Sequence, residues 1–300
     1  MTDTYDRRCM KATTLKPAKY FKADPARGFT LLELLVVIAV IAILASVLLP
    51  TLAKSKARAQ AIFCGNNTRQ LTMAWLMYAD EHDGRLAYNL GSSGPGMVAF
   101  GSSVAMSNNW ANNVLDWDVN NSDNTNAAKL AETGLGPYAS KSANIYRCPS
   151  DYALSSSQQG AGWRTRVRSY SMNAMIGDAG SFTRWGYNEN NPDYLQFFKL
   201  TAVPRPADIF VFLDEHPDSI SDGYFVNKAY KAEWIRLPAS YHDRAASFSF
   251  VDGHVEVHRW RYSRTCPPPL PYQAKLPIQV PADEMADFKW VTSRMSFEQD

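Results

Sequence analysis

The stretch Arg27-Gly28-Phe29-Thr30-Leu31-Leu32-Glu33 decides the fold, because a charged segment ends there and a long apolar run begins. Residues 29–49 form a run of 21 in which Glu33 is the one strongly polar residue. As a helix with a rise of about 1.5 Å per residue, this run spans roughly 30 Å, the thickness of the hydrocarbon core of a bilayer. A carboxylate in that core costs about 2.5 to 3.5 kcal/mol, so Glu33 needs a compensating partner, which a new amino group at Phe29 would supply.

The segment before Phe29 carries a strong positive charge. Residues 1–28 hold seven Lys or Arg and three Asp, a net charge of +4, and the positive-inside rule keeps such a segment in the cytoplasm. Without it, the formal charge of the chain changes from +2 to −2. An ordinary secretory signal fits poorly, since its apolar region is about half as long and is followed by a small-residue cleavage site. We therefore expect a single-pass membrane protein whose C-terminal domain lies outside the cytoplasm.

Residues 28–33, Gly-Phe-Thr-Leu-Leu-Glu, resemble the processing site of type IV pilins and type II secretion pseudopilins. In that family a prepilin peptidase cuts after the glycine and methylates the new N-terminal residue. By this resemblance the glycine is Gly28 and the methylated residue is Phe29. The resemblance also implies that Glu33 neutralises the Phe29 amine of an adjacent subunit during assembly, and Pro50 fits the family pattern. An uncleaved signal anchor is the alternative.

The helix is expected to continue beyond the membrane, over about residues 29–81. Its outer part carries an apolar stripe with the spacing i, i+3, i+4, i+7, which should pack on a sheet; the stripe consists of Leu71, Ala74, Trp75 and Tyr78. Gly65 is a point where the helix could bend, and Asp83-Gly84 supplies a stop signal. The expected fold class is α+β, with a long N-terminal transmembrane stem helix packed on the antiparallel β-sheet of a globular, pilin-like head.

This interpretation divides the chain into four parts. They are a cleaved leader (1–28), the transmembrane part of the stem helix (29–50), the periplasmic part of that helix (51–81) and a globular head with a C-terminal hairpin (82–300). The 250 residues after Pro50 are enough for one domain with a sizeable core.

Two stretches of the head read as strands. Residues 209–213, Ile-Phe-Val-Phe-Leu, are a continuous apolar run typical of a buried strand. Residues 246–251 and 254–260 alternate in polarity on either side of Asp252-Gly253, a dipeptide suited to a two-residue type I′ turn. That turn predicts a hairpin in which Phe250 faces Val255 on a buried face, while the serines lie on a wet face.

The middle of the chain predicts irregular structure. Residues 90–126 are rich in Gly, Ser and Asn, and they include Trp110 and Trp117. We expect an ordered insertion whose indoles pin a long loop to the core. The alternative is a carbohydrate-binding surface, because indole faces stack on sugar rings and amides bond hydroxyls.

Three short motifs carry a second resemblance. His242, nine intervening residues and Asp252-Gly253 resemble the H-X9-DG pattern of pilin-like proteins from planctomycete and verrucomicrobial bacteria. Cys64 with residues 66–71 resembles their Cys-x-x-Asn-Leu-x-Gln stretch, with Thr68 in place of Leu, and residues 148–151 resemble their Cys-Pro-x-Asp element. The resemblance implies little chemistry, since the fold leaves the role of such a head open.

The sequence offers two further hypotheses about sites in the head. In an oxidising compartment Cys64 and Cys148 either form a disulfide or remain two buried thiols, and spacing does not decide between them. The loop after the buried strand holds four carboxylates within nine residues, and hard oxygen ligands of this kind suit calcium; they are Asp214, Glu215, Asp218 and Asp222. An acidic turn whose side chains cap backbone amides is the alternative.

Several functional classes find no support in the sequence. It contains no G-x-S-x-G, H-E-x-x-H, P-loop or C-x-x-C motif, and we expect no enzyme and no cofactor other than the calcium ion. After Pro50 there is no cluster of Lys and Arg with interleaved aromatics, so nothing indicates nucleic-acid binding.

The expected function is that of a pilin-like structural subunit in a pilus or pseudopilus fibre, for secretion or surface attachment. Its expected partners are the prepilin peptidase, other pilin-like subunits of the same or different sequence, and the inner-membrane assembly platform. The alternative is a membrane-anchored extracytoplasmic binding module, for instance for carbohydrate, that uses the stem only as an anchor.

Overall fold

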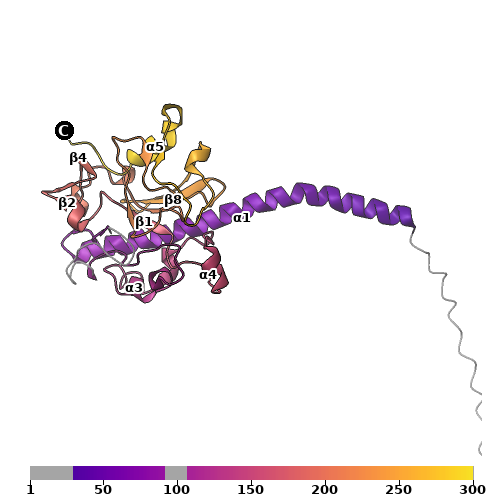
Figure 1. Ribbon diagram of the computed structural model, residues 1–300, viewed down its shortest axis with the longest axis horizontal. Coiled ribbons are helices and arrows are strands. Elements are labelled where there is room, and N and C mark those ends of the chain that lie inside the picture. Colours follow the sequence, from indigo (N-terminus) through magenta and orange to yellow (C-terminus); the bar gives the residue numbers. More distant parts are fainter. Residues whose placement is uncertain (1–29, 92–106, 300) are drawn as a thin grey trace, which may run out of the picture. The chain divides into compact units, whose positions relative to one another are not determined.

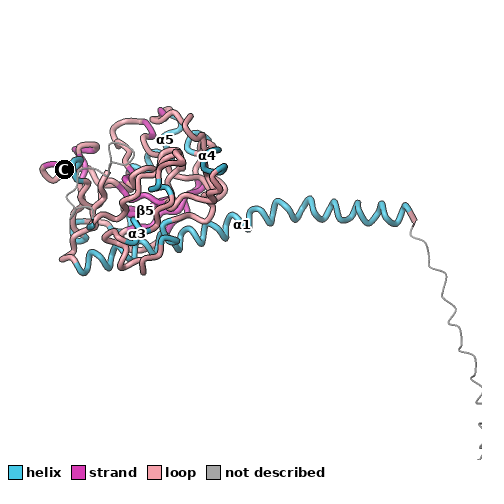
Figure 2. The backbone as a smooth tube through the Cα atoms, turned by 60° about the horizontal axis from the view of Figure 1, so that its bottom comes forward, coloured by secondary structure: helices cyan, strands magenta, loops and turns pink. Residues whose placement is uncertain are grey.

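The computed structural model describes residues 30–91 and 107–299 (Figures 1 and 2). Gly28 and Phe29, where processing was predicted, lie outside these residues. The chain divides into two compact units, residues 1–50 and 51–300, and helix α1 (Leu31–Glu81) belongs to both.

In the first unit α1 is apolar and exposed. It contains a window with a mean hydropathy of 3.0 of which nothing is buried, as a membrane-spanning segment requires. The helix runs from Leu31 through Pro50 without interruption. The long apolar helix of the predicted α+β fold is therefore present.

The second unit contains a five-stranded sheet in the order β6-β1-β5-β8-β9. These strands are β1 (Tyr170–Asn173), β5 (Phe210–Asp214), β6 (Tyr224–Phe225), β8 (Ala245–Phe250) and β9 (Val255–Arg259). All neighbours pair antiparallel except β1 and β6, which are parallel. The predicted buried strand is confirmed as β5, and every residue in it is buried.

Small sheets and short helices complete this unit. One sheet pairs β10 (Ile278–Gln279) with β7 (Glu233–Trp234). Another has the order β2-β3-β4, with bounds Thr183–Arg184, Tyr187–Asn188 and Asn191–Leu195. Among the described residues the helices that follow α1 are short: α3 (Ala128–Ala131), α4 (Ser156–Gly160) and α5 (Met285–Thr292), with brief 3-10 turns such as η1 (Ser122–Asn124) and η2 (Ala143–Tyr146).

The five-stranded sheet lies between two layers. In Figure 1 the outer part of α1 and helix α5 are on opposite sides of β1 and β8. Alternate residues of a strand point to opposite faces, so Phe212 joins the core beside α1 and Leu213 joins the core beside α5. The predicted stripe of α1 is confirmed, since all four of its residues are buried in the first of these cores.

The C-terminal end of α1 has the predicted stop. Asp83 and Gly84 both have positive φ values, 55° and 74°. The Gly84 amide then donates back to the carbonyl oxygen of Ala79 at 2.8 Å. A left-handed residue with such a bond is the usual way to end a helix.

The hairpin between β8 and β9 was predicted in the wrong register. Ser249 pairs with Val255 and Phe248 with Glu256, one residue away from the expected pairing. The connection has three residues rather than two, because Phe250 donates to His254 and Gly253 takes a φ of +89°. A type I turn closed by a left-handed glycine is the usual three-residue hairpin loop.

The serine face of β8 was expected to be wet and is buried instead. Thr72 of α1 donates to the hydroxyl of Ser249 at 2.7 Å. A Cβ on Gly65 would lie only 3.0 Å from Val255 and 3.3 Å from the hydroxyl of Ser247. Small residues on both elements therefore let α1 approach the sheet closely, and Gly65, predicted as a bend, lies within the continuous helix.

The described part of the middle segment is held by buried polar side chains. Residues 107–121 contain no strand, as expected; the buried Asn113 donates to the carbonyl oxygen of Asp123, and the half-buried Asn121 donates to that of Val114. Trp110 is fully buried and Trp117 is 8% exposed, with the guanidinium of Arg166 over its ring at 4.3 Å. These indoles pin the loop, so they do not offer the faces that the carbohydrate alternative needs.

Candidate functional site

The predicted processing region is described from Thr30 onward. The backbone amide of Thr30 donates to the Glu33 carboxylate at 2.9 Å, and its hydroxyl donates to the same oxygen at 2.8 Å. The Glu33 amide donates back to that hydroxyl at 3.2 Å. This reciprocal pattern is a capping box, which satisfies amides that the first turn of a helix leaves without partners. Glu33 is thus held at the start of α1.

A second site lies inside the head, where four side chains from separate segments meet. Cys64 comes from α1, Cys148 follows the short turn η2, Asp214 ends β5, and His242 precedes β8. The ligand atoms that they offer all lie within 4.8 Å of one another, and all four residues are buried. Within the described residues no other group of three or more such side chains comes this close.

The distances within this cluster are short. Cys64 Sγ is 2.8 and 3.0 Å from the two carboxylate oxygens of Asp214. His242 Nε2 is 3.4 Å from Cys148 Sγ and 3.6 Å from Asp214 Oδ2. The cluster therefore combines two sulfurs, one ring nitrogen and one carboxylate around a common centre.

Neighbouring groups fix these side chains in place. The Ser150 amide donates to Cys148 Sγ at 3.4 Å, the Ser247 amide donates to Asp214 Oδ2 at 3.1 Å, and the Tyr170 hydroxyl donates to Cys64 Sγ at 3.2 Å. His242 is followed by two residues with positive φ, 55° and 64°, although neither is glycine. Such backbone persists only where the surroundings enforce it, so the turn that follows His242 is tightly held.

Burial and charge shift the titration of the cluster. Burial, the hydrogen bond with Cys148 and the charge of Asp214 raise the pKa of Cys64 well above its usual range. Burial alone would lower the pKa of His242, but contacts with Asp214 and Cys148 outweigh it and raise the pKa to about 10. With protons alone balancing the charges, Cys64 is a thiol and His242 faces Asp214 as an imidazolium.

The motifs of the second resemblance supply three of the four residues of this cluster, Cys64, Cys148 and His242. Asn67, the asparagine of the motif that begins at Cys64, donates to the carbonyl oxygen of Arg147 at 3.0 Å and so ties α1 to the segment that carries Cys148. Asp151 accepts from the hydroxyl of Ser169 at 2.8 Å and from the amide of Ala153 at 3.1 Å. These contacts hold the Cys148 turn in place.

Asp252 and Gly253 do not reach the cluster. Asp252 accepts from the His254 amide at 3.1 Å, and Gly253 closes the hairpin loop. The whole of β8 separates this turn from His242.

Cys64 and Cys148 are buried free thiols in the structure, which is one of the two alternatives that the sequence left open. The two residues do come together, as a disulfide would also require. Each sulfur nevertheless faces a polar partner, Asp214 for Cys64 and His242 for Cys148.

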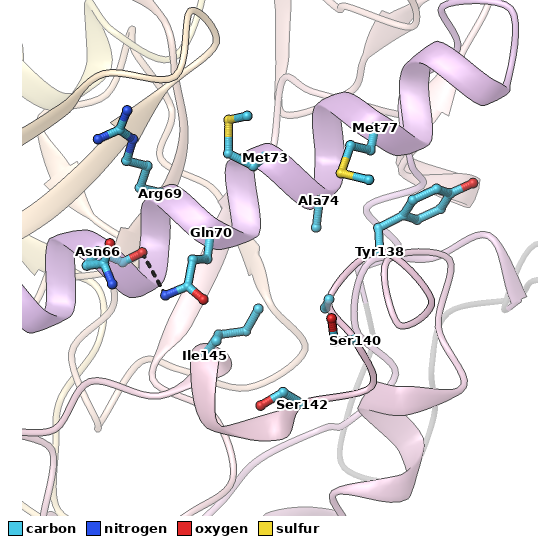
Figure 3. A pocket seen from close by; sticks show the side chains of 11 residues that line it. Asn66, Arg69, Gln70, Met73, Ala74, Met77, Tyr138, Ser140, Ser142 and Ile145 are labelled. Atoms are coloured by element: carbon cyan, nitrogen blue, oxygen red, sulfur yellow. Dashed lines mark hydrogen bonds between the residues drawn. The ribbon is translucent and has the colours of Figure 1, made fainter.

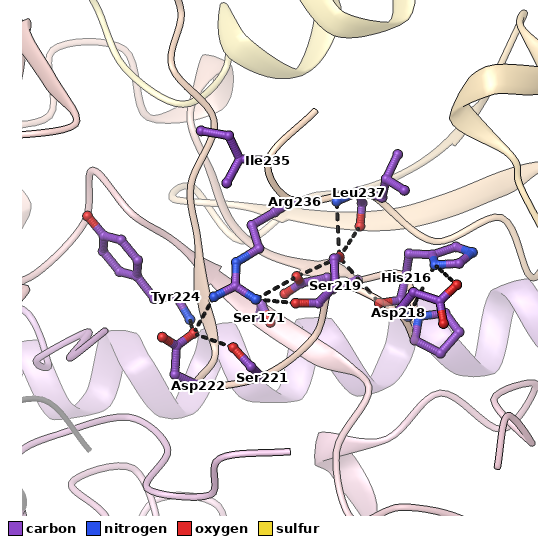
Figure 4. A network of polar contacts seen from close by, with 12 residues as sticks. Ser171, His216, Asp218, Ser219, Ser221, Asp222, Tyr224, Ile235, Arg236 and Leu237 are labelled. Carbon is purple, nitrogen blue, oxygen red and sulfur yellow. Dashed lines mark hydrogen bonds and ion pairs between the residues drawn. The ribbon is translucent and has the colours of Figure 1, made fainter. Parts of the chain in front are cut away.

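The four carboxylates predicted as calcium ligands have protein partners and do not converge on one centre; Figure 4 shows two of them, Asp218 and Asp222. Asp214 belongs to the cysteine cluster, and Asp218 accepts from the Leu270 amide at 2.8 Å. Asp222 and Glu215 lie 3.2 and 3.8 Å from the guanidinium of Arg236. Arg236 supplies the opposing charge that the sequence suggested a cation would provide, so this geometry gives the calcium hypothesis no support.

A groove of about 420 Å³ lies between α1 and residues 138–145 (Figure 3). Met73 and Met77 of α1 line one side, and Tyr138 and Ile145 line the other. Arg69 is its one charged residue, so the groove has no acid–base pair and offers a surface for contact.

Comparison with known proteins gives a match at the start of the apolar helix. Residues 25–49 match the family model of the prokaryotic N-terminal methylation motif, and this stretch contains Gly28, Phe29 and Glu33. The match indicates prepilin-type processing of the kind found in pilins and pseudopilins, and the apolar helix indicates membrane anchoring. Neither curated proteins nor solved structures gave a match.

Proposed function

We propose that this protein is a pilin-like structural subunit, which prepilin peptidase cleaves between Gly28 and Phe29 and which then assembles into a pilus or pseudopilus fibre. The observation that carries the proposal is the methylation motif over residues 25–49, at the start of an apolar helix with no buried part in its membrane-spanning window. Such a helix requires lipid or other apolar helices around it.

Assembly exchanges one apolar environment for another. In the membrane the lipid chains cover the segment from Leu31 to Pro50, and in a fibre the same segments of neighbouring subunits cover it. Because both environments are apolar, the exchange costs little hydrophobic free energy, and polar groups decide the register. Glu33 is the polar group available for this purpose, since it is the one charged residue of the run.

Glu33 has two roles that a conservative variant separates. Its carboxylate caps α1 through Thr30, and in the proposed fibre it also neutralises the amine of Phe29 in an adjacent subunit. Glutamine preserves the capping box but carries no charge. Glu33→Gln should therefore be cleaved and remain in the membrane, with the sheared fibre fraction depleted roughly tenfold, which corresponds to about 1.4 kcal/mol of lost ion pairing.

Thr30→Val is the matched control for helix capping. It removes the two hydroxyl bonds, at a cost of about 1 kcal/mol, and leaves the carboxylate charge in place. The measurement is immunoblotting of sheared fibres and membranes from cells that express each variant. Fibre yield from Glu33→Gln equal to that of the native chain would contradict the proposed role of the charge.

A further inference from the structure

We propose that Cys64, Cys148, Asp214 and His242 bind one structural zinc ion in the head. This inference is independent of fibre assembly, because all four residues belong to the second unit. Two thiolates, an imidazole and a carboxylate form a tetrahedral ligand set that suits zinc, whereas calcium and magnesium take oxygen ligands.

The distances from His242 to its neighbours in the cluster fit tetrahedral coordination of an ion. Zinc bonds of about 2.3 Å to sulfur and 2.0–2.2 Å to nitrogen or oxygen place the corners of a tetrahedron about 3.3–3.8 Å apart. The distances from His242 Nε2, 3.4 Å to Cys148 Sγ and 3.6 Å to Asp214 Oδ2, lie in this range. The contact between Cys64 Sγ and Asp214 is shorter, at 2.8 to 3.0 Å, and a bound ion would widen it.

The site is closed, as structural zinc sites are. Cys64, Cys148 and Asp214 have no exposed surface, and His242 is 5% exposed. Four protein ligands leave no open coordination position for a water or a substrate, which distinguishes a structural site from a catalytic one. The ligands belong to four separate segments, so one ion would tie α1, the Cys148 turn, β5 and the turn before β8 together.

A catalytic thiol fits the same residues poorly. In a Cys-His-Asp arrangement the carboxylate binds the ring nitrogen that does not face the nucleophile. Here Asp214 and Cys148 both face Nε2 of His242, while Nδ1 has no hydrogen-bond partner among the described residues. A shared ion explains why Cys148 and Asp214 converge on one nitrogen of His242, and burial denies a substrate access to Cys148.

Zinc binding neutralises most of the negative charge of the ligands and leaves one negative charge, which faces the hydrogen-bond donors around the site. Two thiolates and one carboxylate carry three negative charges, of which Zn²⁺ neutralises two, and His242 binds as neutral imidazole. The two thiol protons and any proton on His242 Nε2 leave to solvent. The amides of Ser150 and Ser247 and the hydroxyl of Tyr170 donate to the ligand atoms, as second-shell groups do.

The test uses the full-length chain, purified in detergent without a polyhistidine tag and without chelator. Elemental analysis should give one zinc per chain, and Cys148→Ser should lose it. Cys266→Ser is the matched control and should retain the metal, because Cys266 is a free, half-buried cysteine outside the cluster.

Two further measurements use the native chain and so do not depend on the folding of a variant. The native chain, stripped with chelator under reducing conditions and reloaded with Co²⁺, should show the charge-transfer absorption of a tetrahedral thiolate site. Cys64 and Cys148 should react with an alkylating agent only after chelation, without any need for reduction. Native protein with no zinc and no such cobalt spectrum, or with both cysteines alkylated only after reduction, would overturn the proposal.

Discussion

Cys64 shows how one side chain connects the stem helix to the rest of the head. Its sulfur contacts Asp214 and accepts from the hydroxyl of Tyr170, at the end of β5 and the start of β1. A buried thiol behaves as a small hydrophobe when it has only apolar neighbours. The polar neighbours of Cys64 instead give it a defined chemical environment, which the proposed zinc ion would use.

Tyr170→Phe should weaken zinc binding without unfolding the head. The ring stays in the core, but the hydrogen bond to Cys64 Sγ is lost, and second-shell changes of this kind cost roughly 10- to 100-fold in metal affinity. The measurement is competition between the full-length protein and a chromophoric chelator.

Tyr241→Phe is the control for that substitution. Its buried hydroxyl has no hydrogen-bond partner within the described part of the chain, although it neighbours His242 in sequence. Its loss should leave zinc affinity unchanged. Equal affinities for Tyr170→Phe and the native chain would show that Tyr170 has no part in holding the ion.

At the scale of elements, the contact between α1 and the β8–β9 hairpin depends on small side chains. A Cβ at Gly65 would already lie 3.0 Å from Val255. Ser247 and Ser249 on β8 likewise keep this face flat. Close approach therefore explains why polar and glycine residues occur where a buried interface would ordinarily contain larger apolar ones.

Gly65→Leu should destabilise the head by about 1–3 kcal/mol or more, because the added side chain overpacks this interface. Gly160→Leu is the matched control, since Gly160 is also helical and has no atom within 4 Å of an added Cβ. Denaturant unfolding of the purified full-length variants measures the difference. Equal denaturant midpoints of unfolding for the two variants would contradict the close packing described for Gly65.

The elements that the sequence predicted well are those with a strong local signal. The stripe of α1, its stop at Asp83-Gly84 and the buried strand β5 follow from periodicity, turn chemistry and continuous apolarity. The hairpin register did not follow, because Asp252-Gly253 suits both a two-residue and a three-residue loop. The prediction that one face of β8 is exposed to solvent was wrong. Serine in a strand ordinarily indicates an exposed position, and the sequence did not show that α1 packs on this face.

The cysteine cluster could be predicted only in pieces. Cys64, Cys148 and His242 each stood out as part of a motif, but Asp214 was assigned to the acidic loop. Residues 64 and 242 are far apart in the chain, and no local pattern brings them together. The available signal was that each of three separate motifs contained a Cys or a His, residue types that bind metals. Nothing in the sequence indicated that Arg236 would pair with Glu215 and Asp222 of the acidic loop.

At the scale of the whole molecule, the proposed cleavage after Gly28 would convert a membrane-anchored precursor with a cytoplasmic leader into a subunit that can assemble. It removes a leader of net charge +4 and leaves a chain of net charge −2. It also creates the amine at Phe29, four residues before the carboxylate of Glu33. The apolar run that anchors the protein in the membrane therefore also carries both groups of the proposed ion pair between subunits, the Phe29 amine and the Glu33 carboxylate.

The central claim is that the chain is a processed, pilin-like subunit, and the N-terminus of the membrane-extracted protein tests it most directly. Intact-mass and N-terminal peptide mass spectrometry should show a chain that begins at Phe29 and carries a methyl group there. Gly28→Leu should leave the precursor uncut, because the peptidase no longer finds the small residue that precedes the bond. A native chain that retains residues 1–28 in fibre-competent protein would contradict the account.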